Sequence, residues 1–203
     1  MSATDVAVAR LAASALLAYP DDELSARLAP VAEAIAGLPA RLRDPLRRLA
    51  AHLSGAARRD LQRDYVATFD LRARCCLYLT WWTHGDTRER GKALVWFKEV
   101  YREAGLTPPA GELPDHLAVV LEFAAVGDPV AGQALLADHR AALELLRDAL
   151  TARRSPYADA VEAVLDTLPP AGESVRQTVR RIAAGGPPRE LVGLEPYPSG
   201  GPR

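Results

Sequence analysis

The residues best suited to chemistry lie in one short stretch of this 203-residue chain. Cys75 and Cys76 are its only cysteines, and His84 and Asp86 follow closely. Structural zinc sites use cysteines separated by about two to four residues, whereas these two are adjacent and no second pair exists. We therefore predict that the stretch binds no metal.

The same thiols could act as nucleophiles if His84 or His116 served as the base. No catalytic-cysteine or nucleophile-elbow signature surrounds them, and the chain has no P-loop and no Gly-x-Gly-x-x-Gly motif. We predict no catalytic residue and no cofactor. A disulfide between neighbours would be strained, so Cys75 and Cys76 are expected to be free thiols in a reducing compartment. A small helical metal or thiol protein that uses this pair is the alternative from a different functional class.

Aromatic side chains crowd into this region although they make up only 6% of the chain. Tyrosine and tryptophan are typical anchors of protein recognition. Tyr65, Phe69, Tyr78 and Trp82 could instead be core residues. Adjacent helical residues diverge by about 100°, so Trp81 and Trp82 cannot both face the core. The pattern favours a surface that recognises another protein.

Composition excludes several other roles. The formal net charge is -1, which argues against nucleic acid as a main partner. No apolar run approaches the roughly 18 to 20 residues that span a bilayer. The apolar N-terminal stretch, residues 6–18, lacks a basic start and is interrupted by Arg10, so it is not typical of a signal peptide. We predict a cytoplasmic protein that does not insert into the membrane, and we favour a monomer.

The elements that must position these residues are helices. Apolar residues recur at helical spacing through most of the chain, and residues 75–82, which could form a strand, have no partner strand. We predict an all-α, single-domain bundle of roughly eight or nine helices over residues 1–184, followed by a flexible Gly/Pro-rich tail over 185–203. One helix is expected from about Ala40 to Leu53, with Asp44-Pro45 as an alternative start. Other expected starts are an Asp86-to-Glu89 capping box and Asp128-Pro129, with one long helix from Asp128-Pro129 to about residue 152.

Several motifs between about residues 65 and 125 resemble those of nitrate reductase molybdenum cofactor assembly chaperones, the NarJ or delta subunit family. They are Tyr65-x-x-x-Phe-Asp70, Arg74-Cys-Cys-Leu-Tyr-Leu-Thr80 and Thr83-His-Gly-Asp-Thr-Arg88. The segment Glu112-Leu-Pro-Asp-His-Leu117 resembles a motif of the wider TorD-like redox-enzyme maturation chaperones.

This resemblance implies an all-helical cytoplasmic chaperone rather than an enzyme. Its expected partner is the apo catalytic (alpha) subunit of respiratory nitrate reductase, including the N-terminal segment of that subunit. Its expected role is to assist molybdenum cofactor insertion and complex assembly before membrane attachment. A chaperone of the same fold that serves another molybdoenzyme is the alternative.

The client segment is expected to be basic and partly apolar, and to lie in a groove of the chaperone. Aromatic residues would line that groove, carboxylates would meet the positive charge, and histidines would make the affinity depend on pH. A capping role alone could account for Asp86. The candidate residues are Tyr65, Phe69, Asp70, Tyr78, Trp81, Trp82, His84, Asp86, Asp115, His116 and Glu122.

Overall fold

The computed structural model describes residues 1–107 and 111–188, and the all-α prediction is confirmed. Within these ranges the chain forms eleven α-helices, more than the eight or nine predicted. They are α1 (Ala3–Leu16), α2 (Asp22–Ala36), α3 (Ala40–Gly55), α4 (Arg58–Tyr65), α5 (Leu79–His84), α6 (Arg88–Glu103), α7 (Leu117–Glu122), α8 (Pro129–Asp138), α9 (Arg140–Ala152), α10 (Ala158–Asp166) and α11 (Glu173–Gly185).

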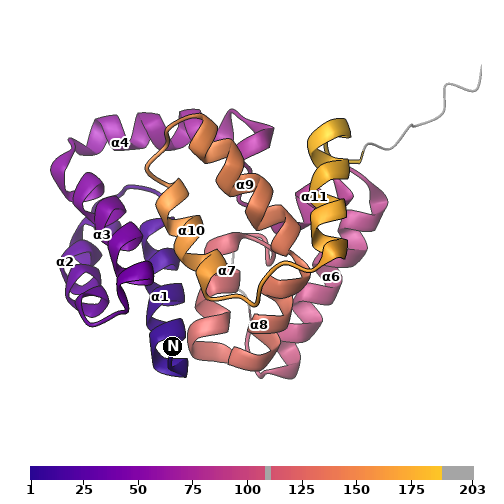
Figure 1. Ribbon diagram of the computed structural model, residues 1–203, viewed down its shortest axis with the longest axis horizontal. Helices are drawn as coiled ribbons and strands as arrows, with labels where there is room; N and C mark the ends of the chain where they lie inside the picture. The colour runs from indigo at the N-terminus through magenta and orange to yellow at the C-terminus, as the bar shows by residue number, and fades with distance from the viewer. Residues whose placement is uncertain (108–110, 189–203) are drawn as a thin grey trace, which may run out of the picture.

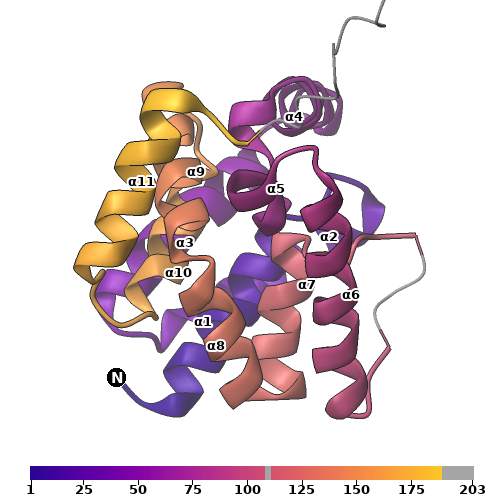
Figure 2. The same ribbon diagram turned by 90° about the vertical axis from the view of Figure 1, so that its right-hand side faces the viewer.

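Helix α1 lies at the centre of the bundle (Figure 1). It packs against α2, α3, α7 and α10, and α10 in turn packs against α3 and α9. In Figure 1, helices α2 to α4 lie on one side of α1 and helices α6 and α11 lie on the other. Figure 2 shows that α11 and α6 are at opposite edges of the bundle. Elements from both halves of the sequence therefore pack against the first helix.

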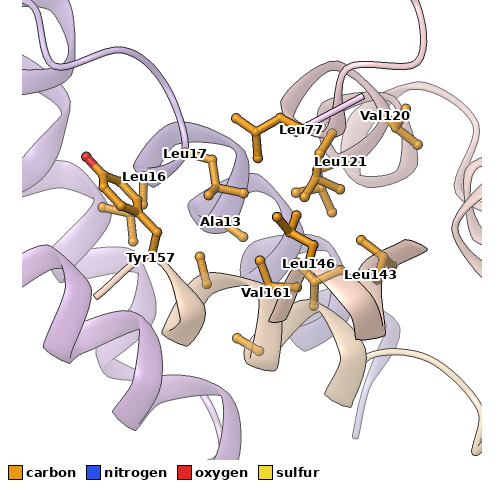
Figure 3. Close-up of a cluster of buried hydrophobic side chains, with 14 of the residues drawn as sticks. Ala13, Leu16, Leu17, Leu77, Val120, Leu121, Leu143, Leu146, Tyr157 and Val161 are labelled. Atoms are coloured by element: carbon orange, nitrogen blue, oxygen red, sulfur yellow. The ribbon is translucent and has the colours of Figure 1, made fainter. Parts of the chain in front are cut away.

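The core forms where these helices meet (Figure 3). Leu16 of α1, Leu121 of α7, Leu146 of α9 and Val161 of α10 are all buried in one cluster. Burying a leucine or valine side chain contributes about 1.5–3 kcal/mol, so this cluster supplies much of the driving force for folding. No helix among the residues described is both long and apolar enough to cross a membrane.

One prediction about a helix boundary is confirmed and another was wrong. Helix α3 begins at Ala40, as predicted, and not at the alternative start Asp44, so Pro45 lies inside it. Leu42 in its first turn is completely buried, and this packing outweighs the backbone hydrogen bond that a proline cannot donate. The expected long helix from residue 128 is divided into α8 and α9 at His139, which is one reason for the larger helix count.

Two helices continue into single π-helical turns. Val66–Asp70 extends α4, and Phe123–Gly127 extends α7. Such turns are rare and often lie at functional sites. The second one directly follows Glu122, one of the candidate binding residues.

The end of the described chain packs against the turn between α5 and α6. Gly85 has a φ of +59°, and a Cβ atom placed on it would lie only 1.7 Å from the carbonyl oxygen of Pro188. Only glycine fits this turn. Most of the predicted tail, residues 189–203, lies outside the described residues, so the boundary at residue 185 stays a prediction.

Candidate peptide-binding surface

Three of the candidate aromatic residues lie in the core. The Tyr65 hydroxyl donates to the backbone oxygen of Leu17 at 3.1 Å. Its ring centre lies 4.7 Å from that of Phe69 in a tilted arrangement, and both rings pack edge-on against Tyr157. Trp82 is also buried. Tyr65 and Phe69 support the fold beneath the surface, and a bound peptide would not reach them without rearrangement. Trp82, although mostly buried, also lines a groove between Ala73–Cys75, α9 and α11.

Asp115 is also internal, with no exposed surface. Its Oδ2 accepts hydrogen bonds from the backbone nitrogen of Thr80 at 3.1 Å and from the Thr80 hydroxyl at 2.6 Å. The two segments are joined further by backbone bonds from Leu79 to Asp115 and from Leu117 to Leu77. Asp115 therefore ties α5 to the start of α7.

Tyr78 and Trp81 reach the surface, but they lie beneath a positive charge. The guanidinium carbon of Arg90 is 5.7 Å from the centre of the Tyr78 ring and 5.9 Å from that of Trp81, which is cation–π geometry. The Tyr78 hydroxyl donates to Glu112 at 3.1 Å, and burial together with this carboxylate raises the pKa of Tyr78 to about 12. A cation over both rings disfavours a basic ligand at this spot.

Arg90 and Glu112 were not among the candidate residues. The candidates were aromatic and acidic residues because the expected ligand is basic and partly apolar. Arg90 follows the Gly85 turn and lies early on α6, so its spacing alone did not indicate that it would lie over Tyr78 and Trp81.

The remaining candidates near the aromatic stretch are dispersed. His116 is half-buried with its ring 5.3 Å from that of Tyr78, and burial lowers the pKa of His116. His84 is half-buried at the end of α5, whereas Asp70 and Asp86 are exposed on different segments. The structure does not bring these four side chains into one groove.

The predicted capping box at Asp86 was wrong. Helix α6 begins at Arg88, its N-cap is Thr87, and no side chain caps it. The Thr87 hydroxyl donates back to the His84 carbonyl at 2.8 Å. The Gly85 turn therefore starts the helix later than the sequence pattern predicts.

Glu122 is a candidate residue that lies at the surface and lines two hollows. It is exposed and borders two open hollows with mainly apolar walls, one of about 360 Å³ and one of about 400 Å³. The first, between α6 and α7, is also lined by Tyr101, Leu106, Thr107, Val119, Phe123, Val126 and Gly127. The second, between α1 and α2, is also lined by Val8, Leu11, Ala12, Ser14, Ala15, Arg27, Pro30, Val31 and Ala34.

The charge of this surface comes from Glu122. Arg27, the other charged residue of the second hollow, forms an ion pair with Glu23. No cation pairs with Glu122 in the part of the chain that the structure describes. Leu11, Leu106 and Val126 are large apolar residues that remain 43%, 45% and 65% exposed. We define the two hollows and Glu122 as the Glu122 surface.

The elements beneath the Glu122 surface are held firmly. The Ser14 hydroxyl donates to the carbonyl of Ala118 at 2.8 Å and so fixes α1 against α7. The Tyr101 hydroxyl donates to the carbonyl of Pro114 at 2.6 Å. A surface of this kind can bind an amphipathic segment without first being ordered.

Cys75 and Cys76 are free thiols, buried and half-buried respectively. Burial raises the pKa of both, which disfavours the reactive thiolate. Across residues 1–107 and 111–188, no three His, Cys, Asp or Glu side chains are grouped as a metal site would require.

The sequence matches the model of a known protein family. The family model described as nitrate reductase delta subunit matches residues 35–163, from just before α3 to within α10. The chain belongs to the nitrate reductase delta subunit family. All eleven candidate residues lie within the matched range.

Relatives in this family cover most of the chain. It is 32% identical over 180 residues to the probable nitrate reductase molybdenum cofactor assembly chaperone NarJ of Bacillus subtilis, covering 88% of this chain and 97% of that protein. It is 35% identical over 153 residues to the NarJ chaperone of Escherichia coli, covering 71% and 63%. It is 45% identical over 161 residues to the nitrate reductase-like protein NarX of Mycobacterium tuberculosis, covering 79% of this chain but only 24% of NarX.

Proposed function

We propose that this protein is a cytoplasmic assembly chaperone for the catalytic subunit of a respiratory nitrate reductase. It binds the apo subunit, including a basic and partly apolar N-terminal segment, and assists molybdenum cofactor insertion before the complex attaches to the membrane. Family membership supports the chaperone role. The Glu122 surface supports the mode of binding, because two apolar hollows flank a carboxylate that has no cationic partner among the described residues.

The apolar hollows and the Glu122 carboxylate contribute to binding in different ways. Removing two medium-sized apolar side chains from water contributes about 3–6 kcal/mol, at 1.5–3 kcal/mol each. An exposed ion pair at Glu122 adds only about 0.2–1 kcal/mol. The hollows therefore supply most of the affinity, whereas Glu122 sets the charge preference and the rate of encounter.

A peptide titration tests this division. We expect Val126→Asp to weaken binding of the client N-terminal peptide at least about 10-fold, since the new charge must be desolvated in an apolar hollow. Glu122→Gln should weaken it by no more than about 5-fold, as expected for an exposed pair, and should reduce its dependence on salt. Isothermal titration calorimetry at two salt concentrations measures both effects.

Two further variants locate the peptide. Asp70→Asn removes an exposed acid outside the Glu122 surface and should leave the affinity unchanged. Trp81→Ala removes the accessible tryptophan of the aromatic stretch. If the Trp81 variant lost binding while the Val126 and Glu122 variants kept it, the peptide would lie over the aromatic stretch and not on the Glu122 surface.

The chaperone role has a separate test in cells. Nitrate reductase produced without this protein is expected to accumulate with little molybdenum, as measured by metal analysis of the purified enzyme. Production of the wild-type chaperone from a plasmid should restore the metal. A full molybdenum content in its absence would contradict the maturation role.

A further inference from the structure

Away from the Glu122 surface, a groove lies between the short helical turn Ala73–Cys75, α9 and α11. Helices α9 and α11 lie side by side (Figure 1), and Ala73–Cys75 packs against α9. The groove has a volume of about 520 Å³. The residues that line this groove include neither Glu122 nor any residue of the two hollows of the Glu122 surface.

The rim of this groove is positively charged. Arg72, Arg74 and Arg153 line it, and all three are exposed. None of them forms an ion pair within the described part of the chain, although many other arginines of the protein do. Arg153 and Arg72 also lower the pKa of the Cys75 thiol in the wall, against the larger effect of burial, which raises it. The positive potential therefore extends into the groove.

The interior of the groove is apolar. Trp82, Leu145 and Ile182 contribute buried side chains. The other lining residues besides the arginines are small or apolar: Ala73, Cys75, Ala149, Ala152, Ala183, Gly186 and Pro187. No Asp, Glu, Asn, Gln, Ser or Thr side chain is among the lining residues described, so apolar side chains of a ligand would be buried there without displacing polar side chains from their hydrogen bonds.

We propose that this groove binds an acidic, partly apolar peptide segment of a partner protein. Carboxylates of that segment pair with the three rim arginines, whose planar guanidinium groups suit bidentate contacts. Apolar side chains between the carboxylates enter the groove. The charge of this groove is positive, whereas that of the Glu122 surface is negative, so one peptide segment does not suit both. A failure of one proposal therefore leaves the other untouched.

The contributions can be ranked. Each exposed arginine–carboxylate pair is weak alone, but three pairs together give a clear, strongly salt-dependent preference for acidic over neutral peptides. Burial of apolar side chains supplies the remainder. A purely acidic peptide without apolar residues should therefore bind more weakly than a mixed one.

The experiment uses the full-length protein and short labelled peptides. The probe is a fluorescein-labelled peptide of about eight alternating Asp and Leu residues, which is long enough to cross the groove in an extended conformation. Its matched controls carry Lys or Gln in place of Asp. We expect the Asp peptide to bind more tightly than the Gln peptide by at least about 10-fold at low salt, and the Lys peptide not to bind at this groove. Fluorescence anisotropy measures the affinities.

Matched variants assign the binding to the groove. The double variant Arg72→Gln and Arg153→Gln should lose most of the preference for the Asp peptide. The control double variant, Arg59→Gln and Arg102→Gln, removes the same charge from exposed positions outside the groove and should retain it. Equal losses in both variants would show a general charge effect and overturn the proposal, as would equal affinity for the Asp and Gln peptides.

Another double variant tests whether the chain's own C-terminal segment occupies the groove. The sequence beyond the described residues contains Glu190 and Glu195 among apolar residues. If the wild-type chain bound no Asp peptide while the Glu190→Gln and Glu195→Gln double variant did, the groove would belong to the chain's own C-terminal segment. That result would replace the partner protein as occupant.

Discussion

Gly132→Ala is expected to lower the free energy of unfolding by about 2 kcal/mol, although alanine is the better helix former. Gly132 lies in α8, where a Cβ atom would come within 2.3 Å of the Ala124 Cα and 2.9 Å of the Ala124 backbone nitrogen. Ala124 belongs to the π-helical turn after α7, which is part of the wall of the Glu122 surface.

Two effects compete at this position. Replacing glycine by alanine inside a helix gains about 1 kcal/mol from backbone entropy. Overpacking a well-filled contact costs about 1–3 kcal/mol, and more where the neighbour cannot turn aside. Because the obstructing atoms are backbone atoms, α8 must move away from Phe123–Gly127 as a whole. The packing cost therefore exceeds the gain in helix propensity.

Gly91→Ala provides the matched control. Gly91 lies in α6, and no atom lies within 4 Å of a Cβ built on it. The same substitution there should raise the free energy of unfolding by about 0.5–1 kcal/mol. Urea denaturation of the two variants beside the wild type measures both effects. Equal changes in the two variants would show that the contact between Gly132 and Ala124 is loose in solution.

The helical class could be predicted from the sequence because its signals are local. Asp128 is an example: its carboxylate accepts hydrogen bonds from the backbone nitrogens of Val130 and Ala131, as the Asp-Pro pattern predicts. Pro45 shows where local signals leave two possible helix starts. Proline usually marks the first turn of a helix, but burial of Leu42 extends α3 backwards past it.

The candidate site depended on contacts that local patterns do not contain. Tyr65 and Phe69 have the composition of binding anchors, yet both are enclosed by Tyr157, which lies far along the sequence. The hollows beside Glu122 have walls from α1, α2, α6 and α7. Residue types therefore indicated a recognition protein, whereas the location of the recognising surface required the packing of distant helices.

Asp115→Ala is the second substitution with a large expected effect, a loss of about 2–3 kcal/mol in the free energy of unfolding. In the wild type, one carboxylate oxygen accepts two hydrogen bonds from Thr80, and Asp115 is completely buried. Alanine would leave the Thr80 backbone nitrogen and hydroxyl without an acceptor. Each unsatisfied buried group costs about 1–3 kcal/mol.

An opposing effect limits this loss. The other carboxylate oxygen, Oδ1, is buried without a hydrogen-bond partner in the described structure, so the wild type already bears a desolvation cost. Asp115→Asn keeps an acceptor for Thr80 and removes the charge, and it should therefore stay within about 1 kcal/mol of the wild type. The difference between the Ala and Asn variants isolates the two Thr80 bonds from the charge.

Chemical denaturation of Asp115→Ala, Asp115→Asn and Asp70→Ala provides the comparison. Asp70 is exposed, so its truncation should change the free energy of unfolding by less than about 0.5 kcal/mol. If Asp115→Ala resembled Asp70→Ala, Asp115 would not tie α5 to α7 and would be available to a ligand, as the sequence analysis expected. If only Asp115→Ala were destabilised, its carboxylate would be a structural link, and the acidic contact for a basic client segment would have to come from exposed positions such as Glu122.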